Sequence, residues 1–358
     1  MIIVNVYVLF EVYMPPRLPL IEGSEKINEG ASSVKRISAI EKRKAKRKRL
    51  PKWFKTSLPV GEAQKKFNEA RDNVREHGLN TVCEEARCPN IHDCWGRGTA
   101  TFMIAGEVCT RGCKFCAVGT VKKPEKLNEN EPQELANSIK RMGLKYAVIT
   151  VVNRDDLEDG GARHYKNCII EVKKQNPEIG LELLCSDLDG NMEALEMLLE
   201  ELPLKVFAHN VECVPRLDSK VRDAKASFEQ SLKILSFARK QRPDLKIKSS
   251  LMVGLGETDQ EILDAMKLLR SSGVDMITLG QYLQPSYKHI PVSRFPEPEK
   301  FAIWDGLARD IGFKAVASGP LVRSSYRAGL LYEESNGGAP VASKNATGSA
   351  MTNISHDT

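Results

Sequence analysis

The chain has 358 residues, of which 41% are apolar and 28% are charged. This ordinary globular composition excludes collagen-like, mucin-like and wholly disordered chains. No apolar run reaches the roughly 20 residues that a membrane-spanning helix needs, so we expect neither a membrane-embedded protein nor a membrane partner. The length suits two average domains or one large α/β barrel.

The net charge of +6 is concentrated in one segment near the start of the chain. Residues 35–50 hold nine Lys or Arg and one Glu, so the other 342 residues carry a net charge of −2. We expect residues 1–50 to be a disordered or leader-like basic arm. A basic run can bind nucleic acid or an import receptor, but no aromatic residue interleaves with these charges. A solvated tail is therefore favoured, with no specific nucleic-acid partner.

The first 13 residues are apolar but make a poor secretory signal. They lack the positively charged N-terminal region of a signal peptide and contain Glu11, and the prolines that follow leave no small-residue cleavage site. Met14 is an alternative start of translation. Acidic residues in the arm argue against a transit peptide, so we expect a cytoplasmic enzyme, with the mitochondrial matrix or plastid as the alternative.

From about residue 100 onward, short apolar runs alternate with amphipathic stretches. Residues 258–272 show the helical pattern, with Thr258 at the N-cap and Ile262, Met266 and Leu269 on one face. Alternating strands and helices predict a parallel sheet, either doubly wound or a barrel, with its chemistry at the carboxyl ends of the strands. The expected strands are Thr101–Ala105, Tyr146–Val152, Leu181–Cys185, Val206–His209, Ile247–Val253, Met276–Leu279 and Lys314–Ala317.

Nine cysteines are present, and six of them lie within 34 residues. A secreted disulfide scaffold is shorter and usually has an even number of cysteines, so clustered thiols indicate metal binding in a reducing compartment. Three cysteines have no cluster-like spacing, and we expect them to be small buried apolar residues. They are Cys168, Cys185 and Cys213.

The first cluster of thiols follows the first expected strand. Cys109, Cys113 and Cys116 have the spacing C-x3-C-x2-C, and Gly112 permits the bend between them. Three thiolates can each bind one iron of a [4Fe–4S] cube and leave the fourth iron open for a small molecule. Zinc is the alternative metal, although zinc–thiolate sites usually contain C-x2-C pairs and four protein ligands.

A second triplet lies upstream. Cys83, Cys88 and Cys94 have the spacing C-x4-C-x5-C and need a fourth ligand from elsewhere in the chain. His92 lies inside this segment, where a packing or surface role is favoured over metal ligation.

The paired triplets resemble those of the lipoyl synthases in the radical S-adenosylmethionine superfamily, and the similarity runs from about residue 52 to 331. That resemblance implies a partial (β/α)6 TIM-type barrel over 99–290, an α/β fold. It also implies an N-terminal extension (51–98) and a C-terminal extension (291–334) that cover the barrel mouth; we expect a disordered tail at 335–358. The other matching segments are RDDLEDGGA (154–162), VFAHNVE (206–212), MVGLGET (252–258), LGQYLQP (279–285) and GPLVRSSYRA (319–328).

The resemblance also implies roles for individual residues. The first triplet would hold the cluster that binds S-adenosylmethionine, and the second would hold an auxiliary [4Fe–4S] cluster with Ser325 as its fourth ligand. A serine oxygen binds iron more weakly than a thiolate, which suits a cluster that must give up sulfur. By itself, the RSSY segment would be interpreted as a helix cap or a phosphate contact. Expected contacts to S-adenosylmethionine are Phe115, Thr150, Asn210 and Glu212.

The implied activity is that of a sulfurtransferase. It inserts sulfur at carbons 6 and 8 of an octanoyl chain on a lysine of a lipoyl carrier domain, and consumes two S-adenosylmethionine molecules and the sulfur of the auxiliary cluster. Implied partners are the E2 subunits of 2-oxoacid dehydrogenases, the glycine cleavage H protein, a ferredoxin or flavodoxin-type reductant and an iron–sulfur carrier. Alternatives are a sulfur-inserting enzyme of the biotin-synthase kind and a non-catalytic zinc or nucleic-acid-binding protein.

Overall fold

The computed structural model describes residues 49–55, 60–76, 81–85 and 88–341, which belong to one compact unit, Arg47–Thr358. The predicted basic arm lies outside these residues, apart from its last two positions. Of the predicted disordered tail, 335–358, residues 342–358 also lie outside them. The prediction is wrong for the first part of the tail, because Ser335 ends a helix and the buried Val341 donates its amide to Glu334. No helix among the described residues has both the length and the apolar character needed to cross a bilayer.

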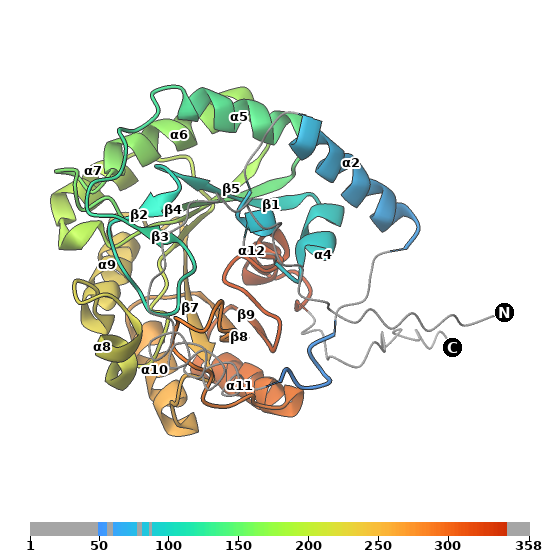
Figure 1. The fold of residues 1–358 in the computed structure, drawn as a ribbon, viewed down its shortest axis with the longest axis vertical. Helices are drawn as coiled ribbons and strands as arrows, with labels where there is room; N and C mark the ends of the chain where they lie inside the picture. Colours follow the sequence, from blue (N-terminus) through green and yellow to red (C-terminus); the bar gives the residue numbers. More distant parts are fainter. Residues whose placement is uncertain (1–48, 56–59, 77–80, 86–87, 342–358) are drawn as a thin grey trace, which may run out of the picture. The chain divides into compact units, whose positions relative to one another are not determined.

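Seven parallel strands form the central sheet, and helices surround it on the outside (Figure 1). The strands follow one another in chain order without a reversal, whereas a doubly wound sheet reverses its order in the middle. The fold is therefore an open half-barrel, with β1 and β9 at its two edges. All seven predicted strands are present: β1 (Thr99–Ile104), β4 (Tyr146–Val151), β5 (Gly180–Leu184), β6 (Val206–Ala208), β7 (Lys246–Val253), β8 (Met276–Gln281) and β9 (Ala315–Gly319).

The α/β half-barrel prediction is confirmed, with six strands between residues 99 and 290 and a seventh, β9, from the segment after residue 290. Two short strands pair separately beside the first cysteine loop, namely β2 (Val108–Cys109) and β3 (Gly119–Thr120).

Helices connect successive strands, and local signals in the sequence fix several of their ends. Thr258 caps α10 through a reciprocal capping box with Glu261, as the sequence predicts for the start of this helix. The α-helices are α2 (Glu62–Glu76), α3 (Val82–Glu85), α4 (Ile91–Gly96), α5 (Glu131–Arg141), α6 (Ala162–Gln175), α7 (Met192–Leu199), α8 (Asp218–Val221), α9 (Phe228–Gln241), α10 (Asp259–Ser271), α11 (Pro298–Ile311) and α12 (Ala328–Ser335). Two 3-10 turns, η1 (Leu188–Gly190) and η2 (Pro215–Leu217), follow β5 and β6.

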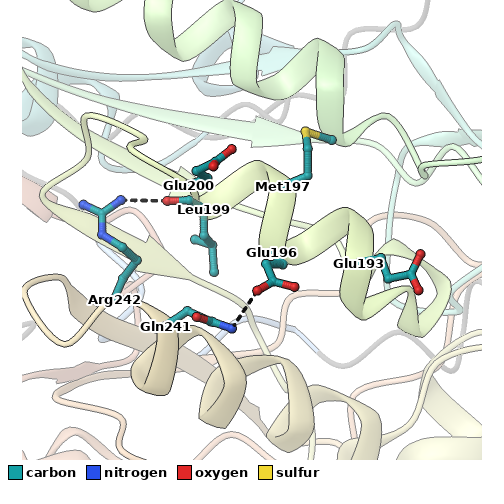
Figure 2. A pocket seen from close by; sticks show the side chains of 7 residues that line it. All are labelled: Glu193, Glu196, Met197, Leu199, Glu200, Gln241 and Arg242. Atoms are coloured by element: carbon teal, nitrogen blue, oxygen red, sulfur yellow. Dashed lines mark hydrogen bonds between the residues drawn. The ribbon is translucent and has the colours of Figure 1, made fainter.

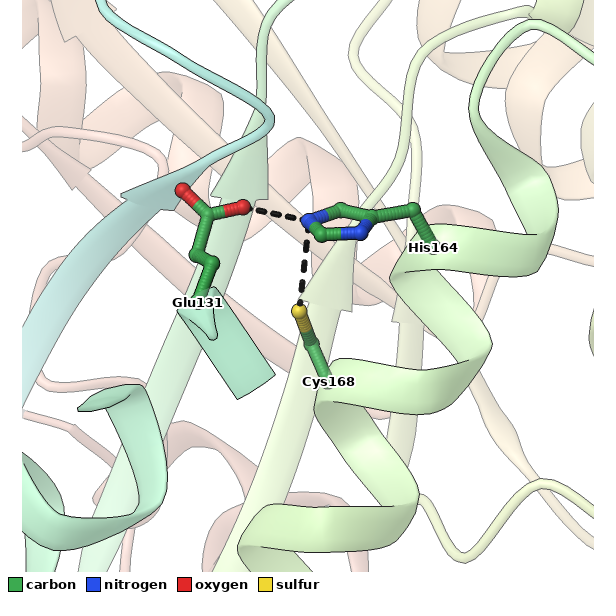
Figure 3. Close-up of side chains that lie close together, drawn as sticks. All are labelled: Glu131, His164 and Cys168. Carbon is green, nitrogen blue, oxygen red and sulfur yellow. Dashed lines mark hydrogen bonds and ion pairs between the residues drawn. The ribbon is translucent and has the colours of Figure 1, made fainter. Parts of the chain in front are cut away.

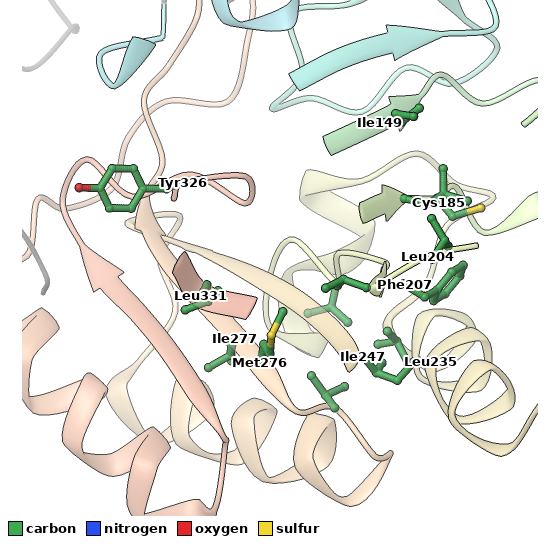
Figure 4. Packing of buried hydrophobic residues seen from close by; sticks show 14 of the residues in the cluster. Ile149, Cys185, Leu204, Phe207, Leu235, Ile247, Met276, Ile277, Tyr326 and Leu331 are labelled. Atoms are coloured by element: carbon green, nitrogen blue, oxygen red, sulfur yellow. The ribbon is translucent and has the colours of Figure 1, made fainter. Parts of the chain in front are cut away.

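The main hydrophobic core lies between the sheet and the outer helices. Phe207 on β6, Ile247 on β7 and Leu235 on α9 belong to this core and are fully buried (Figure 4). The strands are buried along nearly their whole length, as expected for a parallel sheet that is covered on both faces.

The inner face of the barrel carries a buried ion pair. Lys248 on β7 donates to Glu182 on β5 at 2.7 Å, and both side chains are only 1% exposed. The Tyr146 hydroxyl lies 3.5 Å from the other oxygen of Glu182. Burying two charges is costly unless they are paired, so removal of either partner would leave the other charge buried and unpaired.

Helix α12 belongs to the predicted C-terminal extension, but it closes the end of the barrel where the strands begin and not the mouth that the extension is predicted to cover. Ala328 packs in a small cluster with Tyr146 and Val148 of β4, and Tyr332 lies against the same cluster. Gly329 lies so close to Tyr146 that an added Cβ would approach its ring to 3.2 Å. Because the strands are parallel, the opposite end of the barrel, where the strands finish, is left for the site.

Candidate active site

The first cysteine loop leaves β2 and lies at the carboxyl ends of the strands. Backbone amides point at its sulfur atoms: Arg111 and Asn153 donate to the Cys109 sulfur at 3.4 and 3.3 Å, and Asp223 donates to the Cys113 sulfur at 3.3 Å. The Val118 amide donates to the Cys116 sulfur. Hydrogen bonds of this kind stabilise and tune sulfur atoms that bind iron.

Segments from the rest of the barrel hold this loop from several sides. Lys114 donates its amide to the Val221 carbonyl at 2.8 Å and accepts from the Ile290 amide at 3.0 Å. The Nε2 of His289 lies 2.8 Å from the carbonyl of Cys116. The loop is thus fixed by its neighbours rather than by its own short sequence.

A buried arginine within the first cysteine loop, Arg111, connects the loop to carboxylates of neighbouring segments. The side chain of Arg111 is 2% exposed and bonds three carboxylates, those of Asp155, Asp187 and Asp189. Burial alone would lower the pKa of Arg111, but the bonds to Asp155 and Asp187 outweigh it and raise this pKa. The guanidinium therefore stays charged at every relevant pH.

Burial also controls the protonation of the thiols. It raises the pKa of Cys116 above its usual value and that of Cys113 to about 11. A negative charge on Cys116 raises the pKa of Cys113 further, and a charge on Cys109 does the same to Cys116, so the sulfurs are close enough to interact. Metal binding must therefore displace protons from these thiols.

Two of the expected S-adenosylmethionine contacts lie together beside the first triplet. The side chain of Glu212 accepts a hydrogen bond from Asn210, and a charge on Glu212 raises the pKa of both Cys113 and Cys116. Burial raises the pKa of Glu212 itself. Its φ of +65° is rare for a residue with a side chain, and such strained backbone often marks functional sites.

The other two expected contacts occupy neighbouring positions in the fold. Thr150 is half-buried near the carboxyl end of β4, and Phe115 lies inside the cysteine loop, packed against the core. All four residues thus belong to segments at the carboxyl ends of the strands.

The second triplet lies on α3, α4 and the segment between them. Cys83 and Cys94 are buried, and Cys88 is half-buried. Burial raises the pKa of all three thiols, and that of Cys94 to about 12. Charges on Cys83 and Cys88 raise the pKa of Cys94, so these three sulfurs also interact.

Backbone amides point at these sulfurs as well. Asn90 donates to the Cys88 sulfur and Arg327 to the Cys94 sulfur. His92 packs on Phe67 of α2, with 4.1 Å between the ring centroids, and burial lowers its pKa. This places His92 in a packing role, as the sequence predicts.

The RSSY segment is clamped onto the second triplet, although it is more than 230 residues away in the chain. The Asn90 side chain donates to the Leu321 carbonyl at 2.6 Å, and Arg327 pairs with Asp93 at 2.8 Å. In the sequence, Ser325 lies between Arg323 and Arg327. The charge of Arg323 lowers the pKa of Cys88, so this segment lies near the second triplet.

Gly280 allows this clamp to form. A Cβ at this position of β8 would lie 2.1 Å from the Val322 carbonyl oxygen, which is an impossible contact. The absence of a side chain therefore lets the backbone of 320–327 approach the strand.

The thiols fit iron–sulfur clusters better than single metal ions. All six are free, and among the described residues neither triplet has its three sulfurs within 4.8 Å of one another. A tetrahedral zinc ion needs closer sulfurs, since each Zn–S bond is only about 2.3 Å. A four-iron cube suits wider spacing, because each thiolate binds a different iron.

Comparisons with known proteins identify the family. Residues 103–269 match the Radical SAM superfamily, and residues 22–88 match the N-terminal domain of lipoyl synthase. Lipoyl synthase from Marinobacter nauticus is 49% identical over 82% of this chain and 83% of its own, and mitochondrial lipoyl synthase from Bos taurus is 48% identical over 82% and 79%. The chain belongs to the lipoyl synthase family. A lipoyl synthase from Halorhodospira halophila is 46% identical over 90% of this chain and 96% of its own.

As a member of the lipoyl synthase family, this protein is an enzyme that uses S-adenosylmethionine and a [4Fe–4S] cluster. Among solved structures, the FeFe-hydrogenase maturase HydG from Carboxydothermus hydrogenoformans has a TM-score of 0.50 at 16% identity, covering 80% of this chain and 66% of the maturase. That likeness supports the half-barrel fold.

The remaining cysteines are fully buried, which agrees with their predicted packing role. Cys168 lies in a cluster with His164 and Glu131 on α6 and α5 (Figure 3). Nε2 of His164 contacts both Glu131 and, at 3.7 Å, the Cys168 sulfur, and Glu131 also accepts the Ala105 amide at 2.9 Å. Because these groups satisfy one another, the cluster braces the two helices against the end of β1.

An open groove of about 470 Å³ lies on the outer helices, between α7 and the end of α9 (Figure 2). Three glutamates line it, and Arg242 is bonded to the Leu199 carbonyl at 2.8 Å. Its lining includes no cysteine and no residue of either triplet's surroundings, so it is separate from the candidate site.

Sequence reasoning missed the residues that support the first loop. Arg111 was visible inside the triplet and Asp155 inside the RDDL segment, but neither pattern revealed that they pair. Asp187, Asp189 and Asp223 carried no signal beyond their positions after strands or helices.

Proposed function

We propose that this enzyme inserts two sulfur atoms, at carbons 6 and 8, into an octanoyl chain linked to a lysine of a lipoyl carrier domain. The substrate class follows from the lipoyl synthase family. The contact between the RSSY segment and the second triplet carries the proposal, because it would supply the fourth ligand of a second cluster beside the one that the superfamily requires.

Cys109, Cys113 and Cys116 would hold the cluster that binds S-adenosylmethionine. Three thiolates leave one iron without a protein ligand, which is the position that the amino and carboxylate groups of S-adenosylmethionine need. When bound, the cluster and S-adenosylmethionine supply a radical that takes hydrogen from an unactivated methylene, which no side chain can do as an acid or base.

Four residues of the chain would orient S-adenosylmethionine. Glu212 and Asn210, hydrogen-bonded to each other beside the triplet, offer an acceptor and an amide to its polar groups. Thr150 offers a hydroxyl from the end of β4, and Phe115 offers an apolar surface to the adenine.

The second triplet would hold the [4Fe–4S] cluster that is consumed as the sulfur substrate, with Ser325 as its fourth ligand. Three findings support this role: the burial of Cys83 and Cys94, the amide hydrogen bonds to the thiols, and the contacts of Asn90 and Arg327 that hold the RSSY segment beside them. An oxygen ligand is a weaker partner for iron than sulfur, so the cluster can open at that corner.

Helix α12 and the buried Lys248–Glu182 pair close the barrel at the opposite end. Such closure keeps water away from the reacting carbon atoms.

Consumption of a cluster in each cycle requires an iron–sulfur carrier to rebuild it, and cleavage of two S-adenosylmethionine molecules requires a ferredoxin or flavodoxin-type reductant.

We place the enzyme in the cytoplasm, since free thiols need reducing conditions. The mitochondrial matrix and the plastid stroma meet the same need, and cell fractionation distinguishes the three compartments.

The test uses the full chain with both clusters rebuilt anaerobically, together with S-adenosylmethionine, reductant and an octanoyl-lysyl peptide. We expect the wild type to form the lipoyl peptide, and Cys109→Ala to form neither 5′-deoxyadenosine nor product. Cys83→Ala should still form 5′-deoxyadenosine but insert no sulfur, whereas the buried Cys213→Ala control should retain both reactions. Lipoyl product from Cys83→Ala would refute the role of the second triplet and favour a biotin-synthase type of sulfur source.

A further inference from the structure

We propose that Arg111 is a positioning residue that holds the first cysteine loop in its cluster-binding shape before iron arrives. The inference rests on the proposed role of the first triplet. Arg111 lies two residues after Cys109 and two before Cys113, so any movement of its backbone moves both sulfurs.

All three nitrogen atoms of the Arg111 guanidinium donate hydrogen bonds. Nε and Nη2 bond the two oxygens of Asp155 at 3.0 Å each, Nη1 bonds Asp187 at 2.7 Å, and Nη2 also bonds Asp189 at 3.1 Å. Asp155 follows β4, whereas Asp187 and Asp189 follow β5. One side chain therefore joins the cysteine loop to two strands of the barrel. A lysine at this position could not reproduce the planar, two-pronged geometry.

The same loops that bind Arg111 also direct amides at the sulfurs. Asn153, two residues before Asp155, donates its amide to the Cys109 sulfur and accepts the Thr110 amide at 3.0 Å. The Asp155 amide in turn donates to the Thr110 hydroxyl at 3.1 Å. Loss of the Arg111–Asp155 pair would therefore loosen the hydrogen bonds that orient the first thiol.

A second connection reaches Cys113. The Asp223 carboxylate accepts the Gly112 amide at 2.9 Å, and the Asp223 amide donates to the Cys113 sulfur. Lys225 lies between Asp155 and Asp189, at 3.5 and 3.1 Å. The shape of the loop thus depends on one connected set of charges with Arg111 at its centre.

The chain offers a matched control in Arg154. Its side chain is also 2% exposed and also pairs with one aspartate through two bonds of 2.8 Å, to Asp156. Its other bonds reach the carbonyls of Ala105 and Glu125, outside the cysteine loop. Arg154→Lys therefore changes a similar buried pair, and none of the side-chain bonds that it alters reaches the cysteine loop.

The experiment compares Arg111→Lys and Arg154→Lys in a Cys83→Ala chain, so that bound iron reports only on the first triplet. Each protein is reconstituted anaerobically, and the rate of iron loss to a chelator is followed by absorbance. We expect Arg111→Lys to lose iron about 10-fold faster than the parent, in line with the cost of removing residues that orient metal ligands. Arg154→Lys should lose iron at the parent rate even if its melting temperature falls.

Equal rates of iron loss for Arg111→Lys and the parent would overturn the inference. If Arg111→Lys gives no folded protein, Asp189→Asn replaces it, because this carboxylate is 48% exposed and its loss leaves no buried unpaired charge. An Asp189→Asn rate equal to that of the parent would then also overturn the inference. Failure of the proposed role of the first triplet is a separate result, because the Cys83→Ala parent itself would then bind no iron.

Discussion

At the scale of single residues, the choice of ligand atom would decide what a cluster on each triplet can do. The second triplet is complete only if a fourth group comes from elsewhere, and the clamp by Asn90 and Arg327 brings Ser325 into that region. Serine rather than cysteine at this position suits a cluster that must be opened, because iron binds a thiolate more strongly than a hydroxyl oxygen.

Replacing Ser325 by cysteine should therefore stabilise the second cluster and block its use. For Ser325→Cys we expect about eight irons per chain, as for two four-iron clusters, but at least about 10-fold less lipoyl product, as for changes close to a metal site. Iron analysis and mass spectrometry of the peptide measure the two quantities. Ser324→Cys is the matched control and should behave as the wild type. An equal loss of product in both variants would argue against Ser325 as the ligand.

A buried histidine beside the barrel gives a separate, pH-dependent prediction. His209 bonds the Cys185 carbonyl and the Ser231 hydroxyl at 2.9 Å each, and burial lowers its pKa to about 4. The unfolded chain has a histidine pKa of about 6.5, so below this pH the unfolded state binds more protons than the folded state. The free energy of unfolding must therefore fall as the pH drops from about 6.5 toward 4.

At pH 5 this histidine alone should cost about 2 kcal/mol of stability relative to pH 7. Urea unfolding of the wild type and of His209→Gln at both pH values measures the difference. We expect the variant to be less stable at pH 7 but to lose about 2 kcal/mol less on acidification. The same loss in both proteins would show that other groups cause the pH dependence.

At the scale of secondary-structure elements, the sequence predicts the positions of the strands well but not their order in the sheet. Apolar runs of strand length locate all seven strands, and Thr258 marks the start of α10, because burial and capping leave local patterns. The choice between a barrel and a doubly wound sheet depends on strand order, which no local pattern contains. The entry of α12 into the barrel is likewise a consequence of tertiary packing.

The candidate site divides in the same way. Thiol spacing predicts the two cysteine loops directly, because the ligands of each triplet are close in sequence. Ser325 came only from the family resemblance, since its approach to the second loop depends on contacts across more than 230 residues. The carboxylates around Arg111 could not be paired from the sequence, because three separate loops supply the connected groups.

Gly280 provides the test at this scale, because its missing side chain makes room for the RSSY segment. An added Cβ would lie 2.1 Å from the Val322 carbonyl oxygen, so Gly280→Ala must push the segment away from β8. We expect loss of the second cluster, about four irons per chain, with the first cluster retained. The control is Gly306→Ala, where a Cβ meets nothing within 4 Å. Full iron content in Gly280→Ala would mean that the segment is not needed for the second cluster.

At the scale of the whole molecule, one half-barrel carries two thiol sites with different surroundings. The first triplet lies at the carboxyl ends of the strands, where Arg111 joins its loop to Asp155, and we propose that its cluster has one iron without a protein ligand. The second lies on short helices before β1 and is covered by the segment that follows β9. This division suits one cluster that is kept through each cycle and another that is consumed.

The most direct test of that division follows the sulfur atoms. The second cluster is rebuilt with sulfur-34 sulfide, and a single turnover is run with an octanoyl-lysyl peptide in unlabelled buffer. We expect both sulfur atoms of the lipoyl product to carry the heavy isotope, at the enrichment of the cluster. A product with only natural-abundance sulfur would rule out the second cluster as the sulfur source, because the sulfur would then come from the first cluster or from outside the protein.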